Sequence, residues 1–270
     1  MIRAATGADP EIVVRAVAAG VDDNQPYADP SVAERDSAVL GLARLLIGNT
    51  AGGAALLGPT GFTVTAAEDP LTGRGYVLAL AETTTPRAWG LYLIDASAPP
   101  RLAIAVPHPK SDTRCERLAL RLWRAVPGSI LMLSAVHRAV ADAAQDTASV
   151  LHHLWTDVLG PWGVPQLQIH GFADATAVEQ VAVSTGAGPV NPVAERIADA
   201  IEGTGLRTSR SWDGTADVDL RATTNRQGIA ARDNGWTWAH LEHSHQVRYA
   251  TALWHPAIDA VAATDPGLPG

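Results

Sequence analysis

Cysteine and lysine are almost absent from this sequence: Cys115 and Lys110 are the single examples among 270 residues. One cysteine excludes an intrachain disulfide and a zinc site built from cysteines. Long apolar runs are missing as well, since none approaches the ~20 residues that span a bilayer, and no signal-peptide core follows Met1. These absences make the cytoplasm the expected compartment.

Positive charge is also scarce. The formal net charge is −8 at pH 7 and the isoelectric point is about 5.5, which argues against nucleic acid or an anionic membrane as a partner. With 47% hydrophobic residues the chain has enough apolar material for a large core. Its length suits one large α/β domain, or one domain with a small appendage.

The first hundred residues are predicted to form a helical segment and an antiparallel β-ribbon that pack on a main domain spanning residues 101–270. Two helices are expected between residues 10 and 48, the second over 32–47, and glycine-rich residues 48–61 predict a loop. Strands are predicted over 62–66, 76–81 and 90–94. This part of the chain shows no recognisable chemistry.

From residue 102 onwards, apolar strand patterns alternate with helix patterns. The strands are predicted over 102–106, 130–135, 166–169, 180–184 and 236–242. The helices are predicted over 112–125, 139–158, 192–203 and 246–261, and a loop over 223–234. Such alternation is typical of α/β proteins and predicts a mixed, mostly parallel sheet flanked by helices.

Three predicted strands are followed by a histidine: His108, His137 and His170. Because ligands bind outside the carboxyl ends of strands in open α/β sheets, these imidazoles are expected to converge on one crevice. Two imidazoles and a carboxylate are a common protein ligand set of catalytic zinc. His108 and His170 are the first candidates because both directly follow apolar strands, and Asp112 is the best-placed carboxylate along the chain.

Another carboxylate could replace Asp112 as the ligand, and Asp112 itself could have a different role. Glu116 is the other nearby carboxylate, one turn deeper in the predicted helix. Together with Ser111, Asp112 could also simply cap that helix, because both side chains accept hydrogen bonds from free N–H groups. The sequence leaves these possibilities open.

Glu242 ends the predicted strand 236–242, on the same face as Trp238 and His240. A carboxylate at the end of an apolar strand is costly without a partner. An ion pair with an arginine such as Arg248 explains it, and so does a role as general base beside a metal.

Arginines near the strand ends are candidate anchors for an anionic substrate, because guanidinium matches carboxylate in a bidentate way. The candidates are Arg138, which could also hold a developing oxyanion, Arg226 beside Asn225 in a predicted loop, and Arg248. His137 is assigned to substrate binding with them. The expected partner is a small-molecule or peptide substrate that carries a carboxylate, and the oligomeric state is left open.

Other residues are weaker candidates. Those for metal binding are His152, His153, Asp146, His240, His243 and His245, of which His243 and His245 are expected to face solvent. The turn 186–188 precedes a helix and could bind phosphate, but it lacks the lysine and the full fingerprint of a nucleotide site.

Several short segments occur in a familiar order. They are His108 with a nearby carboxylate, Ser134-Ala135-Val136-His137, Ile169-His170-Gly171-Phe172, Val181-Ala182-Val183-Ser184-Thr185-Gly186, Thr224-Asn225-Arg226, and His240-Leu241-Glu242-His243-Ser244 with Arg248. In this order the chain resembles the zinc-dependent poly-γ-glutamate hydrolases of phage type, relatives of zinc carboxypeptidases and N-formylglutamate amidohydrolases. The resemblance covers about residues 102–250.

This resemblance implies a carboxypeptidase-like fold and a zinc ion held by His108, Asp112 and His170. Glu242 would be the catalytic carboxylate, and Arg248, with Asn225 or Arg226, would bind a substrate carboxylate. The chain differs from the family pattern after His108, where Pro109-Lys110 replace glycines, and at Asp112, where the family has a glutamate. We therefore expect a zinc-dependent hydrolase of a peptide, γ-glutamyl or N-acyl amino acid bond. The alternative is a metal-free binding protein on the same scaffold.

Overall fold

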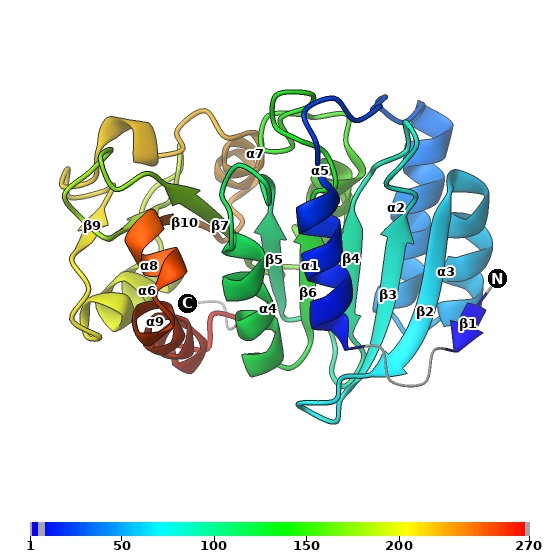
Figure 1. Ribbon diagram of the computed structural model, residues 1–270, viewed down its shortest axis with the longest axis horizontal. Coiled ribbons are helices and arrows are strands. Elements are labelled where there is room, and N and C mark those ends of the chain that lie inside the picture. The colour runs from blue at the N-terminus through cyan, green and yellow to red at the C-terminus, as the bar shows by residue number, and fades with distance from the viewer. Residues whose placement is uncertain (1, 5–8, 268–270) are drawn as a thin grey trace.

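A single mixed β-sheet organises the computed structural model, which describes residues 2–4 and 9–267 (Figure 1). Within these residues the sheet has ten strands in the order β1-β2-β3-β4-β6-β5-β7-β10-β8-β9. The strands are β1 (Ile2–Ala4), β2 (Phe62–Glu68), β3 (Gly75–Ala81), β4 (Leu91–Asp95), β5 (Leu102–Val106), β6 (Ser129–Leu133), β7 (Gln166–Phe172), β8 (Val181–Ser184), β9 (Thr208–Arg210) and β10 (Trp238–Ser244). The predicted α/β class is confirmed.

Helices cover both faces of this sheet. They are α1 (Pro10–Gly20), α2 (Val32–Leu46), α3 (Thr50–Leu57), α4 (Cys115–Ala125), α5 (Val150–Leu154), α6 (Pro192–Glu202), α7 (Arg226–Asn234), α8 (His245–Tyr249) and α9 (Thr251–Ala263). Short 3₁₀ turns occur at Gly58–Thr60 and Val218–Leu220, and a π-helical turn, Trp155–Leu159, extends α5. Among the described residues, none of the helices combines the length and the apolar character that crossing a bilayer demands.

The four central strands are parallel and carry the carboxyl edge on which the site is built. β6, β5, β7 and β10 pair in parallel, in that order. On one side β4 joins β6 in antiparallel register and continues into β3 and β2, while on the other side β8 joins β10 in antiparallel register. The predicted N-terminal ribbon is therefore hydrogen-bonded directly into the main sheet.

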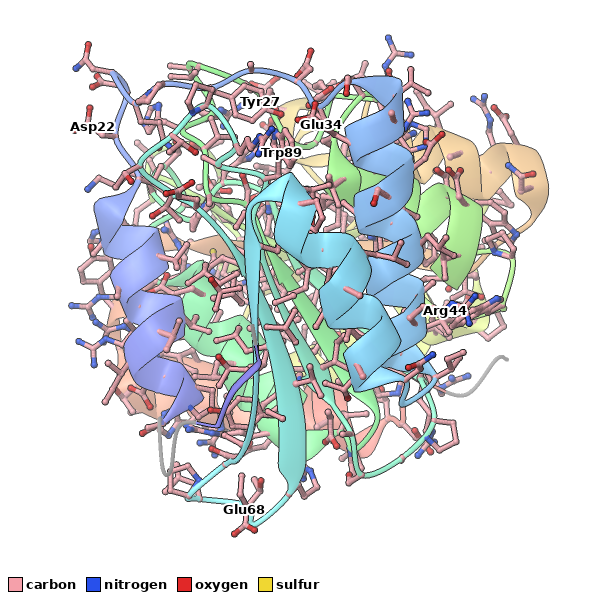
Figure 2. The ribbon with its side chains drawn as sticks, turned by 90° about the vertical axis from the view of Figure 1, so that its right-hand side faces the viewer. Asp22, Tyr27, Glu34, Arg44, Glu68 and Trp89 are labelled. Carbon is pink, nitrogen blue, oxygen red and sulfur yellow. The ribbon has the colours of Figure 1, made fainter. Side chains whose placement is uncertain are left out.

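The alternation of side chains along the strands divides the core into two layers. In β5, Leu102, Ile104 and Val106 pack with α1, α4, α6 and α9, whereas Ala103 and Ala105 pack with α2, α3 and α5. Figure 2 shows this division, with α1 on one side of the sheet and α2 and α3 on the other. The small alanines bring the second helical layer close to the central strands.

Two segments predicted as loops contain helices. Residues 48–61 include α3, which begins where the Asn49 side chain accepts the N–H of Gly52. A Cβ atom on Gly53 would lie 2.4 Å from the Leu45 side chain and 2.8 Å from the Gly41 carbonyl, so these glycines permit close packing of α2 on α3. Residues 223–234 include α7, which Asn225 caps.

Other boundaries also differ from the prediction. The helix predicted over 139–158 begins only at Val150, and an irregular loop precedes it. The helix predicted from 112 begins at Cys115. The closing helix is divided into α8 and α9 at Ala250, and β10 extends two residues beyond its predicted end, to Ser244.

Candidate functional site

Polar side chains replace apolar ones on one face of β7 and β10, near their carboxyl ends. The two strands run in register, with Gln168 opposite His240 and His170 opposite Glu242. The alternate residues of both strands face the layer of α4 and α9, for example Ile169. The site therefore lies on the opposite face of the sheet, the one covered by α5 and α7.

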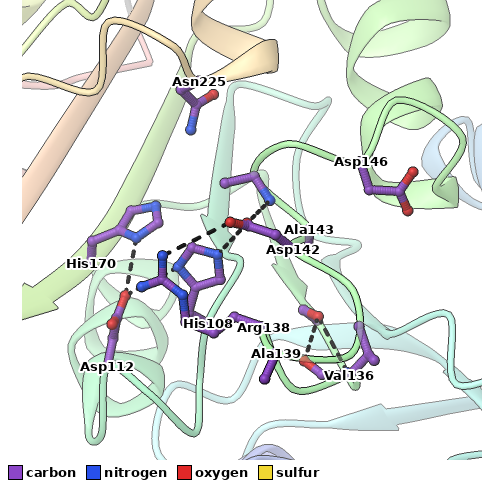
Figure 3. A network of polar contacts seen from close by, with 12 residues as sticks. His108, Asp112, Val136, Arg138, Ala139, Asp142, Ala143, Asp146, His170 and Asn225 are labelled. Atoms are coloured by element: carbon purple, nitrogen blue, oxygen red, sulfur yellow. Dashed lines mark hydrogen bonds and ion pairs between the residues drawn. The ribbon is translucent and has the colours of Figure 1, made fainter. Parts of the chain in front are cut away.

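His108, Asp112 and His170 come together at this edge. Their candidate ligand atoms all lie within 4.8 Å of one another, and all three residues are buried. Asp112 Oδ2 is 3.0 Å from His170 Nδ1 and 3.5 Å from His108 Nδ1. Figure 3 shows Asp112 pointing toward His170, with His108 beside them. The two imidazoles thus present the same ring atom to one carboxylate.

The opposite ring nitrogens are held by acceptors. His108 Nε2 lies 2.6 Å from Asp142 Oδ1, and His170 Nε2 lies 3.3 Å from Gln168 Oε1. His108 Nε2 donates to the Asp142 carboxylate. His170 faces an acceptor with each nitrogen, so both contacts are hydrogen bonds when the ring carries two protons. When a metal takes the place of the Nδ1 protons, the Nε2 protons stay and the Nδ1 atoms become ligands. A proton shared by Asp112 and the Nδ1 atoms is what a metal ion would displace.

The charges in the cluster favour a cation. Burial raises the pKa of Asp112, but the nearby imidazoles of His108 and His170 outweigh burial and hold that pKa well below its ordinary value. Burial lowers the pKa of His170, while the neighbouring carboxylates of Asp112 and Asp142 overcome burial and raise the pKa of His108. Asp112 is therefore ionised, and its negative charge favours a cation beside it.

The donor set fits a zinc ion. His108 Nδ1 is buried and has no hydrogen-bond partner, although an imidazole nitrogen at such a place ordinarily has one. It faces a second imidazole nitrogen and an ionised carboxylate, which are the ligand types of a catalytic zinc site. The residues that would hold the metal are His108, Asp112 and His170.

Glu242 lies next to this cluster with one oxygen unpartnered. Its Oε1 is 3.6 Å from His240 Nε2, and its buried Oε2 accepts no hydrogen bond. Burial, assisted by the negative charge of Asp112, raises the pKa of Glu242 to about 8. With His170 and His240 it forms a second group of candidate ligands within 4.8 Å. The ion pair with Arg248 that could have explained this acid is not formed.

The prediction that Arg248 binds substrate is wrong. Its side chain is only 4% exposed, and it donates to the carbonyls of His243, Thr113 and Phe172 at 3.1, 2.6 and 3.0 Å. A Cβ atom on Gly171 would lie 2.3 Å from its Nε. The guanidinium thus ties α8 to the ends of β7 and β10 and to the loop before α4.

The other predicted substrate anchors lie in different places. Asn225 is 3% exposed, caps α7 and donates to Gln168 Oε1 at 2.8 Å, so its assignment to substrate binding is corrected to a structural role. Arg226 is exposed on α7. His137 lies in the loop after β6, where its Nδ1 accepts from the N–H of Ala139. Within the described residues, no hydrogen bond or ion pair joins either side chain to the cluster.

Arg138 lies at the exposed edge of the cluster. Its guanidinium is 3.8 Å from Asp142 Oδ2, and its side chain is 49% exposed. Figure 3 shows it beside His108. Among the arginines named from the sequence, Arg138 is the one with a solvent-exposed guanidinium next to the cluster.

Both alternatives for Asp112 are decided by position. Glu116 faces a separate pocket of about 780 Å³ next to α1, where it lies 3.6 Å from Arg117, so it is not part of the cluster. Asp112 does not cap α4 with its side chain, because the N-cap position belongs to Arg114, at a φ of 74°. Asp112 is the carboxylate between the two imidazoles.

Most of the weaker candidates lie away from the cluster, but His240 belongs to the second group, with His170 and Glu242. Asp146 accepts from Tyr27 Oη at 3.2 Å and points away from the cluster in Figure 3, and His153 pairs with Asp157 at 2.7 Å. The expectation of a solvent-facing His243 is wrong: the ring is fully buried on the opposite face of the sheet, and burial lowers its pKa to about 4. His245 is exposed, as predicted.

The turn considered for phosphate is occupied by its own hydrogen bonds. Thr185 Oγ1 donates to the carbonyl of Gly188 at 3.1 Å. The side chain of Asn191 accepts the N–H of Ala194 and so caps α6. These contacts already use the Thr185 hydroxyl and the N–H of Ala194, two of the donors that a phosphate would need.

Asp142 and Gln168 were not predicted from the sequence. Asp142 lies in an irregular loop, so no periodicity identifies it. Gln168 did leave a signal: in Gln166-Leu167-Gln168-Ile169-His170, polar residues alternate with apolar ones in a strand that is buried on both faces. Buried polar groups need partners, and this alternation could have indicated a hydrogen-bonded network.

Comparisons with known proteins give structural similarity without sequence similarity. No protein-family model matches the chain, and no curated protein is significantly similar to it. An N-formylglutamate amidohydrolase from Ralstonia eutropha JMP134 is similar over 66% of this chain and 97% of its own, with 11% identity and a TM-score of 0.45. A metallo-carboxypeptidase from Pseudomonas aeruginosa is similar over 89% of this chain and 68% of its own, with 13% identity and a TM-score of 0.42.

A third similar structure is a cell shape determinant protein from Helicobacter pylori, described as a D,L-carboxypeptidase. The match covers 61% of this chain and 50% of that protein, so the chain spans about half of its length, with 13% identity and a TM-score of 0.42. At these TM-scores and identities the likeness carries no functional argument, and function is inferred from the geometry of the site.

Stability is expected to fall as the pH drops from about 6.5 to about 4, partly through His152. Burial lowers the pKa of this histidine from 6.5 to about 4, so between these values the unfolded chain binds more protons than the folded one. Protonation therefore favours unfolding in this range. Melting temperatures measured against pH should show a shallower slope for His152→Gln than for the wild type, with exposed His245→Gln as the control. Equal slopes for His152→Gln and the wild type would contradict this assignment.

Proposed function

We propose that the protein is a zinc-dependent hydrolase of an amide bond, with zinc held by His108, Asp112 and His170. The observation that carries this proposal is the convergence of the two Nδ1 atoms on Asp112 Oδ2, at 3.5 and 3.0 Å. These atoms come from two strand ends and the turn that follows one of them, and Glu242 lies beside them. The combination supports metal-assisted hydrolysis over a purely structural use of these residues.

The chemistry that zinc supplies when bound is Lewis acidity, which polarises a carbonyl group and acidifies water. Asp112, His108 and His170 would hold the metal near the carboxyl ends of β7 and β10, beside Glu242. The Arg138 guanidinium neutralises a substrate carboxylate or the oxyanion that develops at the carbonyl oxygen. Arg138 is 49% exposed and Glu242 is 12% exposed, so Arg138 would contact the substrate from the solvent side.

Glu242 is the general base in this proposal. Its Oε2 has no other partner, so it is free to take the proton of the attacking water and to pass it to the leaving nitrogen. A pKa near 8 lies close to neutrality, where a carboxylate both accepts and returns a proton efficiently. The positive charge of a bound metal lowers that pKa and favours the ionised base.

The substrate class follows from Arg138 and from the resemblance stated above. A guanidinium at the entrance favours a substrate with a carboxylate near the scissile amide. Candidate substrates are γ-glutamyl amides, as in the poly-γ-glutamate hydrolases, N-acyl amino acids and peptides with a free C-terminus.

Metal analysis of the purified protein, combined with a hydrolysis screen of these three substrate classes, tests the proposal. We expect about one zinc per chain and hydrolysis of at least one class that stops when the zinc is chelated. A protein that takes up no zinc when incubated with it would overturn the proposal and favour the metal-free binding protein. Zinc uptake without hydrolysis of any class would remove the catalytic part.

Zinc affinity is expected to depend on Asp142, although this residue would not touch the metal. Asp142 accepts from His108 Nε2 at 2.6 Å and so keeps His108 Nδ1 available. Outer partners of ligand histidines typically contribute about 10–100-fold to metal affinity, so Asp142→Ala should weaken zinc binding by that factor. Asp142→Asn, which keeps an acceptor oxygen, should weaken it less. Asp146→Ala, in the same loop, is the control, and equal affinities of Asp142→Ala and the control would contradict the role.

A further inference from the structure

We infer that Gln168 is a positioning residue that keeps a proton on His170 Nε2 and joins His170 and His108 in one hydrogen-bonded frame. The inference rests on the proposed function only where the frame orients ligands of a zinc ion. It goes beyond the proposed function because it assigns roles to Gln168, Asn225 and Gln227.

The frame begins at main-chain donors whose chemistry is fixed. The Oδ1 atom of Asn225 accepts the N–H groups of Gln227 and Gly228 at 3.0 and 3.1 Å. Because those N–H groups can only donate, the orientation of the Asn225 amide is determined, and its Nδ2 points away from the helix. The Nδ2 atom donates to Gln168 Oε1 at 2.8 Å.

The orientation of Gln168 follows from that bond. Its Oε1 must face Asn225 because an NH₂ group cannot accept, and the same oxygen lies 3.3 Å from His170 Nε2. His170 Nε2 can therefore only donate to this oxygen, while Nδ1 faces Asp112 Oδ2 at 3.0 Å. When a metal displaces the Nδ1 proton, the proton on Nε2 remains. A chain of three bonds thus transmits the orientation of two main-chain N–H groups to one imidazole nitrogen.

The other end of the frame is fixed in the same way. Gln168 Nε2 donates to Gln227 Oε1 at 3.0 Å, and Gln227 Nε2 donates to the carbonyl of Ala143 at 3.3 Å. A carbonyl only accepts, so the orientation of Gln227 agrees with that of Gln168. Both glutamine side chains are completely buried.

The frame links the two proposed ligands. Ala143 follows Asp142, which holds His108 Nε2. The path from His170 through Gln168 and Gln227 to Ala143 therefore reaches the residue that orients His108. A shift of α7, of the 142–144 loop or of β7 would displace both imidazoles together.

Amides suit this frame better than carboxylates. Gln168 makes two accepted and two donated hydrogen bonds, the last to Gln166 Oε1 at 3.4 Å, which uses all four positions of its amide. A carboxylate would leave Gln227 Oε1 without a donor and would add a buried negative charge. A neutral, fully satisfied amide orients the histidine without changing the charge of the site.

The test compares three variants in NMR spectra of the ring nitrogens and in zinc affinity. Gln168→Leu removes the acceptor, and Gln168→Glu restores an acceptor oxygen. Asn225→Asp keeps the cap of α7 but cannot donate to Gln168, so it loosens the frame in a folded protein. Asp146→Ala, in the loop that carries Asp142 but outside the frame, is the control. Gln166→Leu removes only the 3.4 Å bond from Gln168 Nε2 and touches no atom of His170, so it measures the loss of that bond alone. His170→Gln identifies the His170 signals.

In wild-type protein, with zinc and without it, we expect a slowly exchanging proton on His170 Nε2. This signal should weaken or broaden in Gln168→Leu and Asn225→Asp and persist in Gln168→Glu and Gln166→Leu. Zinc affinity should fall by about 10–100-fold in Gln168→Leu and Asn225→Asp, and less in Gln168→Glu and Gln166→Leu. Melting curves identify any variant that has failed to fold. If Gln168→Leu does not fold, the Nε2 signal of Asn225→Asp tests the inference.

Two outcomes would overturn the inference: a neutral His170 with its proton on Nδ1 in the metal-free wild type, or an Nε2 signal unchanged in both Gln168→Leu and Asn225→Asp. The failure of the proposed function looks different. A wild type that binds no zinc but keeps the Nε2 proton would refute zinc hydrolysis and support the frame.

Discussion

Replacing Glu242 by glutamine is expected to reduce kcat by about 10²–10⁴-fold, the contribution typical of a general base, while leaving the zinc content unchanged. The substitution keeps the size and burial of the side chain but removes its ability to take a proton at Oε2, which has no other partner in the structure. KM should change little, because Arg138 and the zinc-binding residues remain. Steady-state kinetics and metal analysis of the same preparation measure both effects.

The chain offers a matched control for this experiment in Glu116. It is also a buried glutamate, 6% exposed, with an unpartnered Oε2 and a pKa that burial raises, but it lies in the separate pocket beside α1. Glu116→Gln should leave kcat close to that of the wild type, because Glu116 faces the separate pocket and lies outside the cluster. Comparable losses in the two variants would refute the assignment of Glu242 as the base.

Replacing His170 by alanine is expected to abolish stoichiometric zinc binding. The variant loses the Nδ1 atom that lies 3.0 Å from Asp112 Oδ2, which leaves one imidazole and one carboxylate, too few ligands for a stable site. The bound zinc should fall from about one per chain to a small fraction of that. Hydrolysis should fall with it, because the carbonyl is no longer polarised.

Thermal unfolding separates loss of the metal from loss of the fold. A ligand that binds the folded state raises the melting temperature, so added zinc should stabilise the wild type and not His170→Ala. His245→Ala, at an exposed ring on α8, should behave like the wild type. If His170→Ala retained one zinc per chain, the ligand set proposed here would be refuted.

The central strands and two of the proposed ligands were predictable from the sequence because their signals are local. Branched residues in 102–106 indicate a buried strand at any position in the fold, and the parallel order of such strands brings His108 and His170 to one edge. The third histidine, His137, did not follow this rule. β6 ends at Leu133, so His137 lies in the loop beyond the carboxyl edge.

The partners of these histidines were not predictable because they depend on contacts between distant segments. Asp142 reaches His108 from an irregular loop, and Asn225 reaches Gln168 only because α7 begins at that residue. The loop predicted over 48–61 was wrong for the same reason, because the helix α3 in this segment depends on its contact with α2. In 48–61 the glycines resemble a flexible loop, but their lack of side chains allows α2 and α3 to pack closely, a property that the second helix alone reveals.

Gly171 and Arg248 have a consequence for how this chain can vary. The space that any side chain at 171 would take is filled by the guanidinium of Arg248. Substitutions at the two positions are therefore coupled. A larger residue at 171 becomes acceptable only after 248 has become small, and that intermediate leaves three main-chain carbonyls without their donor. Among related sequences, we expect glycine and arginine to be kept or lost together at these two positions.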